Sequence, residues 1–130
     1  GRMIVNKILS VVGKGVNVTK ILDKSMLLGA KAFAFLVKNG VKLFEPFAIY
    51  RIRDLLIKFG ADASIIIYVT ESHAYIPPYK EFNESSISSL AQLKNLLQAT
   101  SGDAILVIFS ANVLDAEKAL LKTLLELNIL

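Results

Sequence analysis

The sequence contains no cysteine and no tryptophan, and His73 is its single histidine. Without cysteine the chain cannot form a disulfide framework, a zinc finger, an iron–sulfur site or a cysteine nucleophile. With one histidine it also lacks the imidazoles from which most other zinc sites are built. Gly13-Lys14-Gly15 resembles a phosphate loop, but the earlier glycine and the following Ser or Thr of that motif are missing. We therefore predict no metal and no cofactor.

Long apolar runs are also missing. No stretch approaches the roughly 20 apolar residues of a membrane-spanning helix. Asn6 and Lys7 interrupt the first apolar segment, which argues against a signal peptide. These features predict a cytoplasmic protein with no membrane partner. Gly1 and Arg2 precede Met3 and are interpreted as a cloning remnant.

The 130 residues are 54% hydrophobic and 20% charged, which excludes a mainly disordered chain. A chain of this length is typical of one domain with its own core. We therefore expect a single α/β domain over residues 3–130.

Alternation of apolar segments predicts the secondary structure. Three strands rich in β-branched or aromatic residues are expected at 32–37, 64–70 and 104–109. Apolar residues at helical spacing predict helices at 4–12, 17–28, 46–60, 86–99 and 112–127, with a strand as the alternative for the first. Because helices separate these strands, the pattern favours crossover connections and parallel pairing. The expected fold is an α/β three-layer sandwich with a small, mostly parallel sheet of three to four strands and flanking helices.

Polar residues follow the second and third predicted strands. In parallel sheets, ligands bind beyond the carboxyl ends of the strands. That rule makes ligand-binding candidates of Thr70, Glu71, Ser72, His73, Ser110 and Asn112. His73 would supply an imidazole that titrates near neutral pH, and the helix beginning at Asn112 would offer its amides to an anion. The alternative is that these residues only end strands, form a turn and cap the last helix.

The segment 71–85 is predicted as a long loop, and it contains Pro77-Pro78. Loops of this length often serve as lids or binding segments. Its apolar residues Tyr75, Ile76, Tyr79 and Phe82 would then pack over a ligand or a partner. Equally, they would cover the edge of a narrow sheet.

Positive charge is concentrated in the first half of the chain. Residues 1–60 hold 11 basic and 3 acidic residues, whereas residues 61–130 hold 4 basic and 8 acidic ones. This asymmetry suggests an acidic partner, nucleic acid, or head-to-tail contact between copies. The basic-surface candidates are Lys20, Lys24, Arg51 and Arg53. No recognised RNA- or DNA-binding motif accompanies them, and the alternative is that they form solvated helix faces.

The last predicted helix carries leucines on more than one side. Leu114, Leu121 and Leu125 lie on a different side from Leu120 and Leu124. A helix that is apolar nearly all round is buried on several sides, which suggests a homo-oligomer. The sequence therefore predicts a small cytosolic ligand-binding or protein-interaction module that self-associates. The alternatives are a basic nucleic-acid-binding protein, and a small enzyme or nucleotide binder that uses the strand ends around His73; no catalytic motif supports the enzyme.

Overall fold

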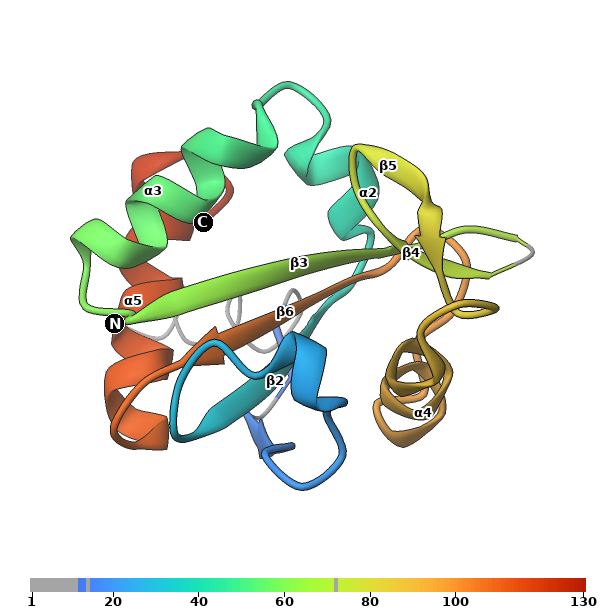
Figure 1. The fold of residues 1–130 in the computed structure, drawn as a ribbon. Helices are drawn as coiled ribbons and strands as arrows, with labels where there is room; N and C mark the ends of the chain where they lie inside the picture. The colour runs from blue at the N-terminus through green and yellow to red at the C-terminus, as the bar shows by residue number, and fades with distance from the viewer. Residues whose placement is uncertain (1–11, 14, 72) are drawn as a thin grey trace.

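The computed structural model describes residues 12–13, 15–71 and 73–130, and these form one sheet with helices packed against it (Figure 1). The sheet has six strands in the order β1-β2-β6-β3-β4-β5, and every neighbouring pair is antiparallel. Its strands are β1 (Val16–Asn17), β2 (Ala32–Val37), β3 (Ala63–Val69), β4 (Ala74–Ile76), β5 (Tyr79–Asn83) and β6 (Ala104–Phe109). The helices of the described residues are η1 (Lys24–Met26, a 3-10 turn), α2 (Gly40–Phe44), α3 (Ile49–Lys58), α4 (Ser88–Leu96) and α5 (Val113–Glu126).

The prediction of a small, mostly parallel sheet is wrong. β6 lies between β2 and β3 and runs antiparallel to both, so β2 and β3 point the same way without touching as neighbours. The cause is the hairpin β4–β5, which returns the chain to the end of the sheet where β3 finishes. β6 starts at that same end, with Ala104 opposite Tyr68, and has to run back along β3.

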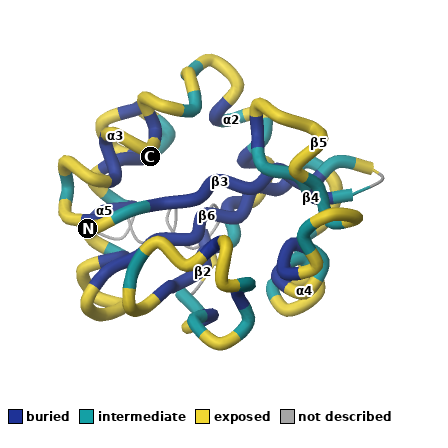
Figure 2. The backbone as a smooth tube through the Cα atoms, in the orientation of Figure 1, coloured by how far each residue is buried: buried dark blue, intermediate teal, exposed yellow. Residues whose placement is uncertain are grey.

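The three central strands are buried on both faces because each face carries its own apolar layer (Figure 2). On one face, Phe35, Ile66 and Leu106 pack with residues of α3 and α5. On the other face, Ile67 and Ile105 pack with residues of α4 and of the segment before β2. The predicted central strands are therefore confirmed to within a residue.

The helix expected over residues 17–28 is not present. Asn17 ends β1, and its side chain accepts hydrogen bonds from the N–H and the hydroxyl of Thr19, at 3.1 and 2.8 Å. The N–H of Val18 donates to the carbonyl of Ala32 on β2 at 2.9 Å. A side chain that bonds a nearby backbone N–H in this way competes with helix formation. Together with the pairing to β2, this contact favours the extended conformation at the start of the segment. The helix expected at 4–12 falls mainly on residues 1–11, outside the described residues.

The expected loop at 71–85 contains the hairpin β4–β5. Pro77 and Pro78, joined by a cis peptide bond, form the turn between its two strands. The predictions for the remaining helices are confirmed in outline. In α5, Asn112 caps the helix as predicted, because its side chain accepts the N–H of Asp115 at 2.9 Å.

Residues 40–44 form a helix that the sequence pattern did not predict. α2 starts after Asn39, whose φ is 58°. The buried carboxylate of Asp103 accepts the N–H of Asn39 at 3.0 Å, so the β2–α2 turn is tied to the start of β6. None of the helices in the described part of the chain combines the length and apolar content that crossing a membrane requires.

Candidate functional site

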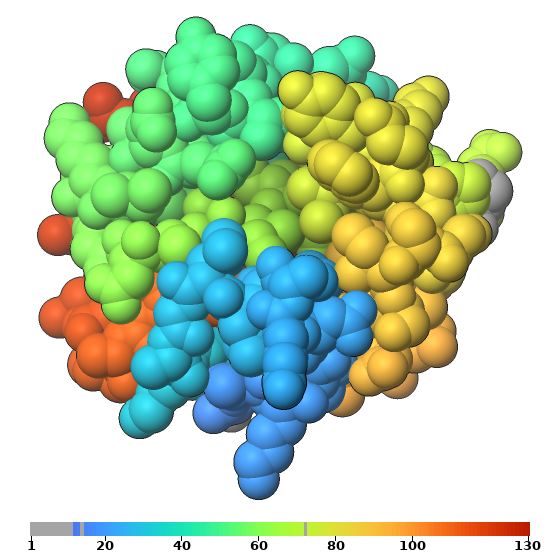
Figure 3. All heavy atoms as spheres, viewed as in Figure 1, coloured from blue at the N-terminus to red at the C-terminus, as the bar shows by residue number. Residues whose placement is uncertain are grey.

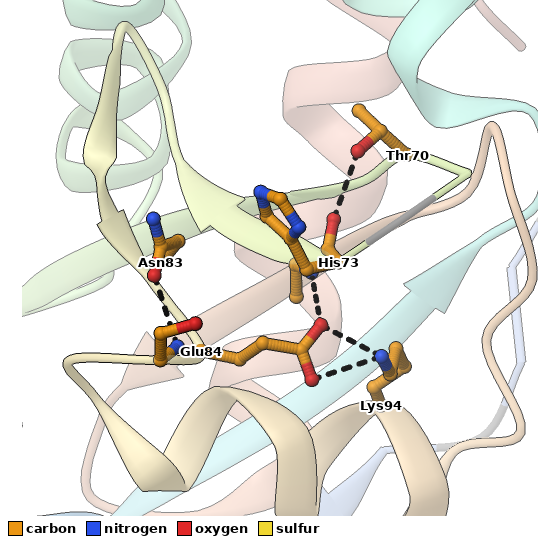
Figure 4. Close-up of polar contacts among 7 residues, drawn as sticks. Thr70, His73, Asn83, Glu84 and Lys94 are labelled. Atoms are coloured by element: carbon orange, nitrogen blue, oxygen red, sulfur yellow. Dashed lines mark hydrogen bonds and ion pairs between the residues drawn. The ribbon is translucent and has the colours of Figure 1, made fainter.

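The residues around His73 form a tight turn between β3 and β4. The carbonyl of His73 accepts the N–H of Thr70 at 3.1 Å and its hydroxyl at 3.0 Å (Figure 4). Glu71 is exposed, and Ser72 lies outside the described residues. Across residues 12–13, 15–71 and 73–130, no three His, Asp or Glu side chains gather as metal ligands would. The geometry of this turn is that of a strand connection.

Next to this turn, Glu84 links the hairpin to α4. Its Oε1 accepts the N–H of Ala74 and the ammonium of Lys94, both at 2.7 Å, and its Oε2 lies 2.9 Å from the same ammonium (Figure 4). Desolvation by burial opposes the charge on Glu84, but the hydrogen bonds from Lys94 and Ala74 and the positive charges of Lys94 and His73 outweigh it. The pKa of Glu84 is therefore below its ordinary value. The sequence analysis did not predict this ion pair. Glu84 follows the hairpin and Lys94 is ten residues later, on α4.

Ser110 and Asn112 lie at the opposite end of the sheet from Thr70 and His73. In the antiparallel pair of β3 and β6, Ala63 stands opposite Phe109, whereas Tyr68 stands opposite Ala104. The expectation that the two groups meet at one edge is therefore wrong. Ser110 donates its hydroxyl to the carbonyl of Asn112 at 2.6 Å. Asn112 is engaged as the helix cap.

The four basic candidates are all exposed, but they do not form one cluster around a site. Arg53, on α3, lines a cleft beside β3, and Lys24 directly precedes Ser25, which lines the same cleft. Arg51 is two residues before Arg53 and is not part of the lining. Lys20 lines a separate hollow beside β1.

The cleft beside β3 is the strongest candidate site. It has a volume of about 330 Å³, within the range of small-ligand sites. In Figure 3 it is a hollow in the face of the molecule, with β3 at its floor and three segments around it. Those segments are the one containing η1, α3, and the β4–β5 hairpin with the residues that follow it. The lining consists of Ser25, Met26, Leu28, Ile49, Arg53, Ser64, Ile65, Ile66, Ile76, Pro77, Phe82 and Ile87.

At the floor of the cleft, no strand of the described residues pairs with the β3 edge that faces away from β6. In an antiparallel ladder, alternate residues direct both their N–H and C=O to the same neighbour. Val69 bonds to Asp103 on the β6 side at 2.9 Å, and Thr70 bonds to His73 on the β4 side at 3.1 Å. Even-numbered residues of β3 therefore direct their backbone groups away from β6. β4 pairs with β3 only at Tyr68 and Val69, so the backbone groups of Ser64 and Ile66 face the cleft, where the two residues are only 2% and 1% exposed.

Two properties of the lining point to a ligand. Ser64 is 2% exposed, and within the described part of the chain its hydroxyl has no hydrogen-bond partner. A buried hydroxyl left without a partner costs about 1–3 kcal/mol, which a ligand would recover. Among the residues that the structure describes, the lining contains no acidic side chain, and Arg53 gives it a positive charge.

Sequence reasoning identified Arg53 and the apolar hairpin residues Ile76 and Phe82 but did not bring them together. The signal available was the Pro77-Pro78 turn between the apolar segment 74–76 and the mixed segment 79–83, which contains Tyr79 and Phe82; this is the spacing of a hairpin. Ser64 carried no signal, because its place in β3 suggested an ordinary buried strand residue. The unpaired edge of β3 depends on the order of the strands in the sheet, which the sequence did not predict.

Residues 28–127 match the sequence family described as a domain of unknown function, DUF4443. The chain belongs to the DUF4443 family. The matched region includes every residue of the cleft lining except Ser25 and Met26. No curated protein matches this sequence.

Among solved structures, this DUF4443 domain is similar to the hypothetical protein PH0730 from Pyrococcus horikoshii OT3. The TM-score is 0.64 with 22% sequence identity, over 96% of this chain and 61% of that protein. At this identity the likeness shows a shared fold. The chain thus spans about three fifths of the length of the protein it resembles.

Proposed function

We propose that this domain is a binding module whose site is the cleft along the part of β3 that β4 does not pair with. The observation that carries the proposal is the buried Ser64 hydroxyl, which lacks a partner among the described residues and belongs to the floor of a cleft of about 330 Å³. Buried polar groups in folded proteins are nearly always hydrogen-bonded, so one left free beside a cleft marks a place for a ligand.

The chemistry of the cleft selects an amphipathic ligand. Most lining side chains are apolar, and Ile49, Phe82 and Ile87 would cover a hydrocarbon or aromatic group. Arg53 at the same cleft would pair with a carboxylate, sulfonate or phosphate. We therefore expect a ligand with an apolar body and one anionic group.

Binding of an anionic naphthalenesulfonate dye tests this proposal, with amide chemical shifts followed by NMR. We expect saturable shifts at Ser64 and Ile66 and along the wall formed by Arg53. Arg53→Glu should weaken the dye's affinity roughly fivefold, equivalent to about 1 kcal/mol for a partly exposed ion pair. Arg51→Glu makes the same charge change on the same helix outside the lining, and should leave the affinity unchanged.

Filling the cleft gives an independent check. Ser25 is exposed at the wall, so Ser25→Phe adds an aromatic ring there without disturbing the core. This variant should abolish the dye's shifts at Ser64 and Ile66. Ser101→Phe, at an exposed turn outside the lining, is the control. Dye binding that Ser25→Phe and Arg53→Glu both leave intact would contradict the proposal.

Self-association is a second candidate property, supported by α5. Leu114 and Leu125 are 57% and 49% exposed, although α5 buries Leu120 and Leu124 against the sheet. Exposed leucines on a helix that is already packed on one side favour contact with a second copy.

A further inference from the structure

We propose that the ligand of this cleft is an extended peptide that adds to β3 as a further strand, with an acidic side chain at Arg53. This inference rests on the proposed function, and it names the class of ligand.

The backbone of β3 offers a repeating set of donors and acceptors. Ser64 and Ile66 each direct one N–H and one C=O away from β6 and toward the cleft, and they are two residues apart. Along a strand that spacing is about 6.8 Å, which is the repeat of a second strand's own hydrogen-bonding groups. An added strand would therefore form up to two pairs of hydrogen bonds. A compact small molecule lacks this repeat, so the edge favours a peptide main chain.

Pro77 leaves this part of the edge free. Tyr68 pairs with Tyr75 in β4, and continuing that register would set Ile66 opposite Pro77. Proline has no N–H and cannot continue the ladder. β4 therefore stops, and the cleft begins where its pairing ends.

The walls of the cleft suit the alternating side chains of a strand. Successive side chains of an added strand would point to opposite faces of the sheet. On the face of α3 they would meet Ile49, and on the opposite face they would meet Met26 and Ile87. The lining includes both Ile65 and Ile66, whose side chains belong to opposite faces, because the cleft lies around the edge of the sheet and not on one side of it.

Charge restricts the peptide further. Arg53 lines the cleft, Lys24 is adjacent to its wall, and none of the described residues of the lining is acidic. An Asp or Glu on the face of the peptide that meets α3 would pair with the guanidinium of Arg53. We expect apolar residues at alternating positions, with one acidic residue among them.

Selection from a phage-displayed library of short random peptides, with the domain immobilised, tests this inference. We expect enriched peptides with alternating apolar residues and an Asp or Glu. A synthetic copy of an enriched peptide is then compared with an analogue that is N-methylated at alternate backbone amides. Methylation keeps the side chains and removes the main-chain donors, so affinity should fall about tenfold or more.

Amide hydrogen exchange locates the contact. In the free domain, the N–H groups of Ser64 and Ile66 should exchange faster than those of Ile65 and Ile67, which bond to β6. Bound peptide should slow exchange at Ser64 and Ile66 and leave Ile65 and Ile67 unchanged. Arg53→Glu should weaken peptide binding, and Arg51→Glu should not.

The outcomes separate the two proposals. If the naphthalenesulfonate dye binds in the cleft but no peptide is enriched, the inference is overturned and the proposed function stands. The inference is likewise overturned if an enriched peptide tolerates N-methylation at every alternate amide, or binds without slowing exchange at Ser64 and Ile66. If neither dye nor peptide binds in the cleft, both proposals fail.

Discussion

Ile66 and Pro77 line the same cleft, the first from β3 and the second from the turn after β4. Pairing of these two strands ends at Tyr68 and Tyr75, just before Ile66 and Pro77 would meet. The hairpin then turns away, and the cleft occupies the space along the remaining part of β3. Pro77, in the turn directly after β4, thus ends the pairing of β4 with β3, and the cleft lies along the part of β3 that β4 does not cover.

The ion pair of Glu84 and Lys94 should contribute to stability at neutral pH. Because the pKa of Glu84 is lower in the folded protein, its contribution is present above its ordinary pKa of 4.5 and is lost as pH falls through the folded pKa. Glu84→Gln should reduce the free energy of unfolding by about 1 kcal/mol at pH 7, and the difference should vanish in acid. Denaturant unfolding over this pH range measures it.

Glu81→Gln is the matched control, since Glu81 is exposed on the same hairpin. It should change the free energy of unfolding little at any pH. Equal losses for Glu81→Gln and Glu84→Gln would show that the ion pair adds nothing specific.

The raised pKa of Tyr68 predicts that the protein loses stability at alkaline pH. Burial, with smaller effects from Tyr75 and Glu45, raises the pKa of Tyr68 from 10.0 to about 12. The unfolded chain therefore loses this proton first, so the free energy of unfolding should fall between those values, by at most about 1.4 kcal/mol per pH unit. Tyr68→Phe should show a flatter pH dependence than the wild type. Tyr50→Phe, at a side chain that is 72% exposed, should behave like the wild type.

Gly40 allows α2 to approach β6 closely. A Cβ at Gly40 would lie 2.5 Å from the Cβ of Ala104, so Gly40→Ala should destabilise the domain by roughly 1–3 kcal/mol. Adding Ala104→Gly removes the nearer atom and should restore part of this loss in a double-mutant cycle. Gly13→Ala, whose Cβ would lie 3.9 Å from Leu36, is the control and should have little effect. Independent, additive effects of the two substitutions would refute the contact.

Association through α5 should be visible in analytical ultracentrifugation. If Leu114 and Leu125 form a contact between copies, the protein should sediment as a dimer or larger species at high micromolar concentration. Leu114→Lys with Leu125→Lys should shift it to the monomer without lowering its melting temperature, because both side chains are about half exposed. A wild-type protein that is monomeric at that concentration would rule out this interface.

The basic residues allow a test of the nucleic-acid alternative. If Lys20, Lys24, Arg51 and Arg53 contact phosphates, affinity for a nucleic-acid probe must fall steeply as salt rises, through counterion release. Fluorescence anisotropy with single- and double-stranded probes at low salt measures this. The absence of binding to every probe would exclude the alternative.

The amino-acid sequence by itself determined the central strands and the later helices. β2 and β6 have the predicted bounds, and α5 begins after the predicted cap Asn112, because apolar periodicity and capping are local properties. Residues 17–28 are different. Their apolar spacing predicts a helix, but the start of this segment pairs with β2 instead, and a contact between segments so far apart cannot be read from a short stretch of sequence.

Strand order and the cleft were decided by tertiary structure. The sequence showed strands separated by helices, but the insertion of β6 between β2 and β3 depends on where the β4–β5 hairpin returns the chain. That order separated His73 from Asn112 and, among the described residues, left Ser64 and Ile66 without a paired strand on the side of the cleft. The periodicity of apolar residues indicates which residues are buried. Which backbone groups of a strand remain unpaired depends on which strands lie beside it, and strand order is set only when distant segments pack together.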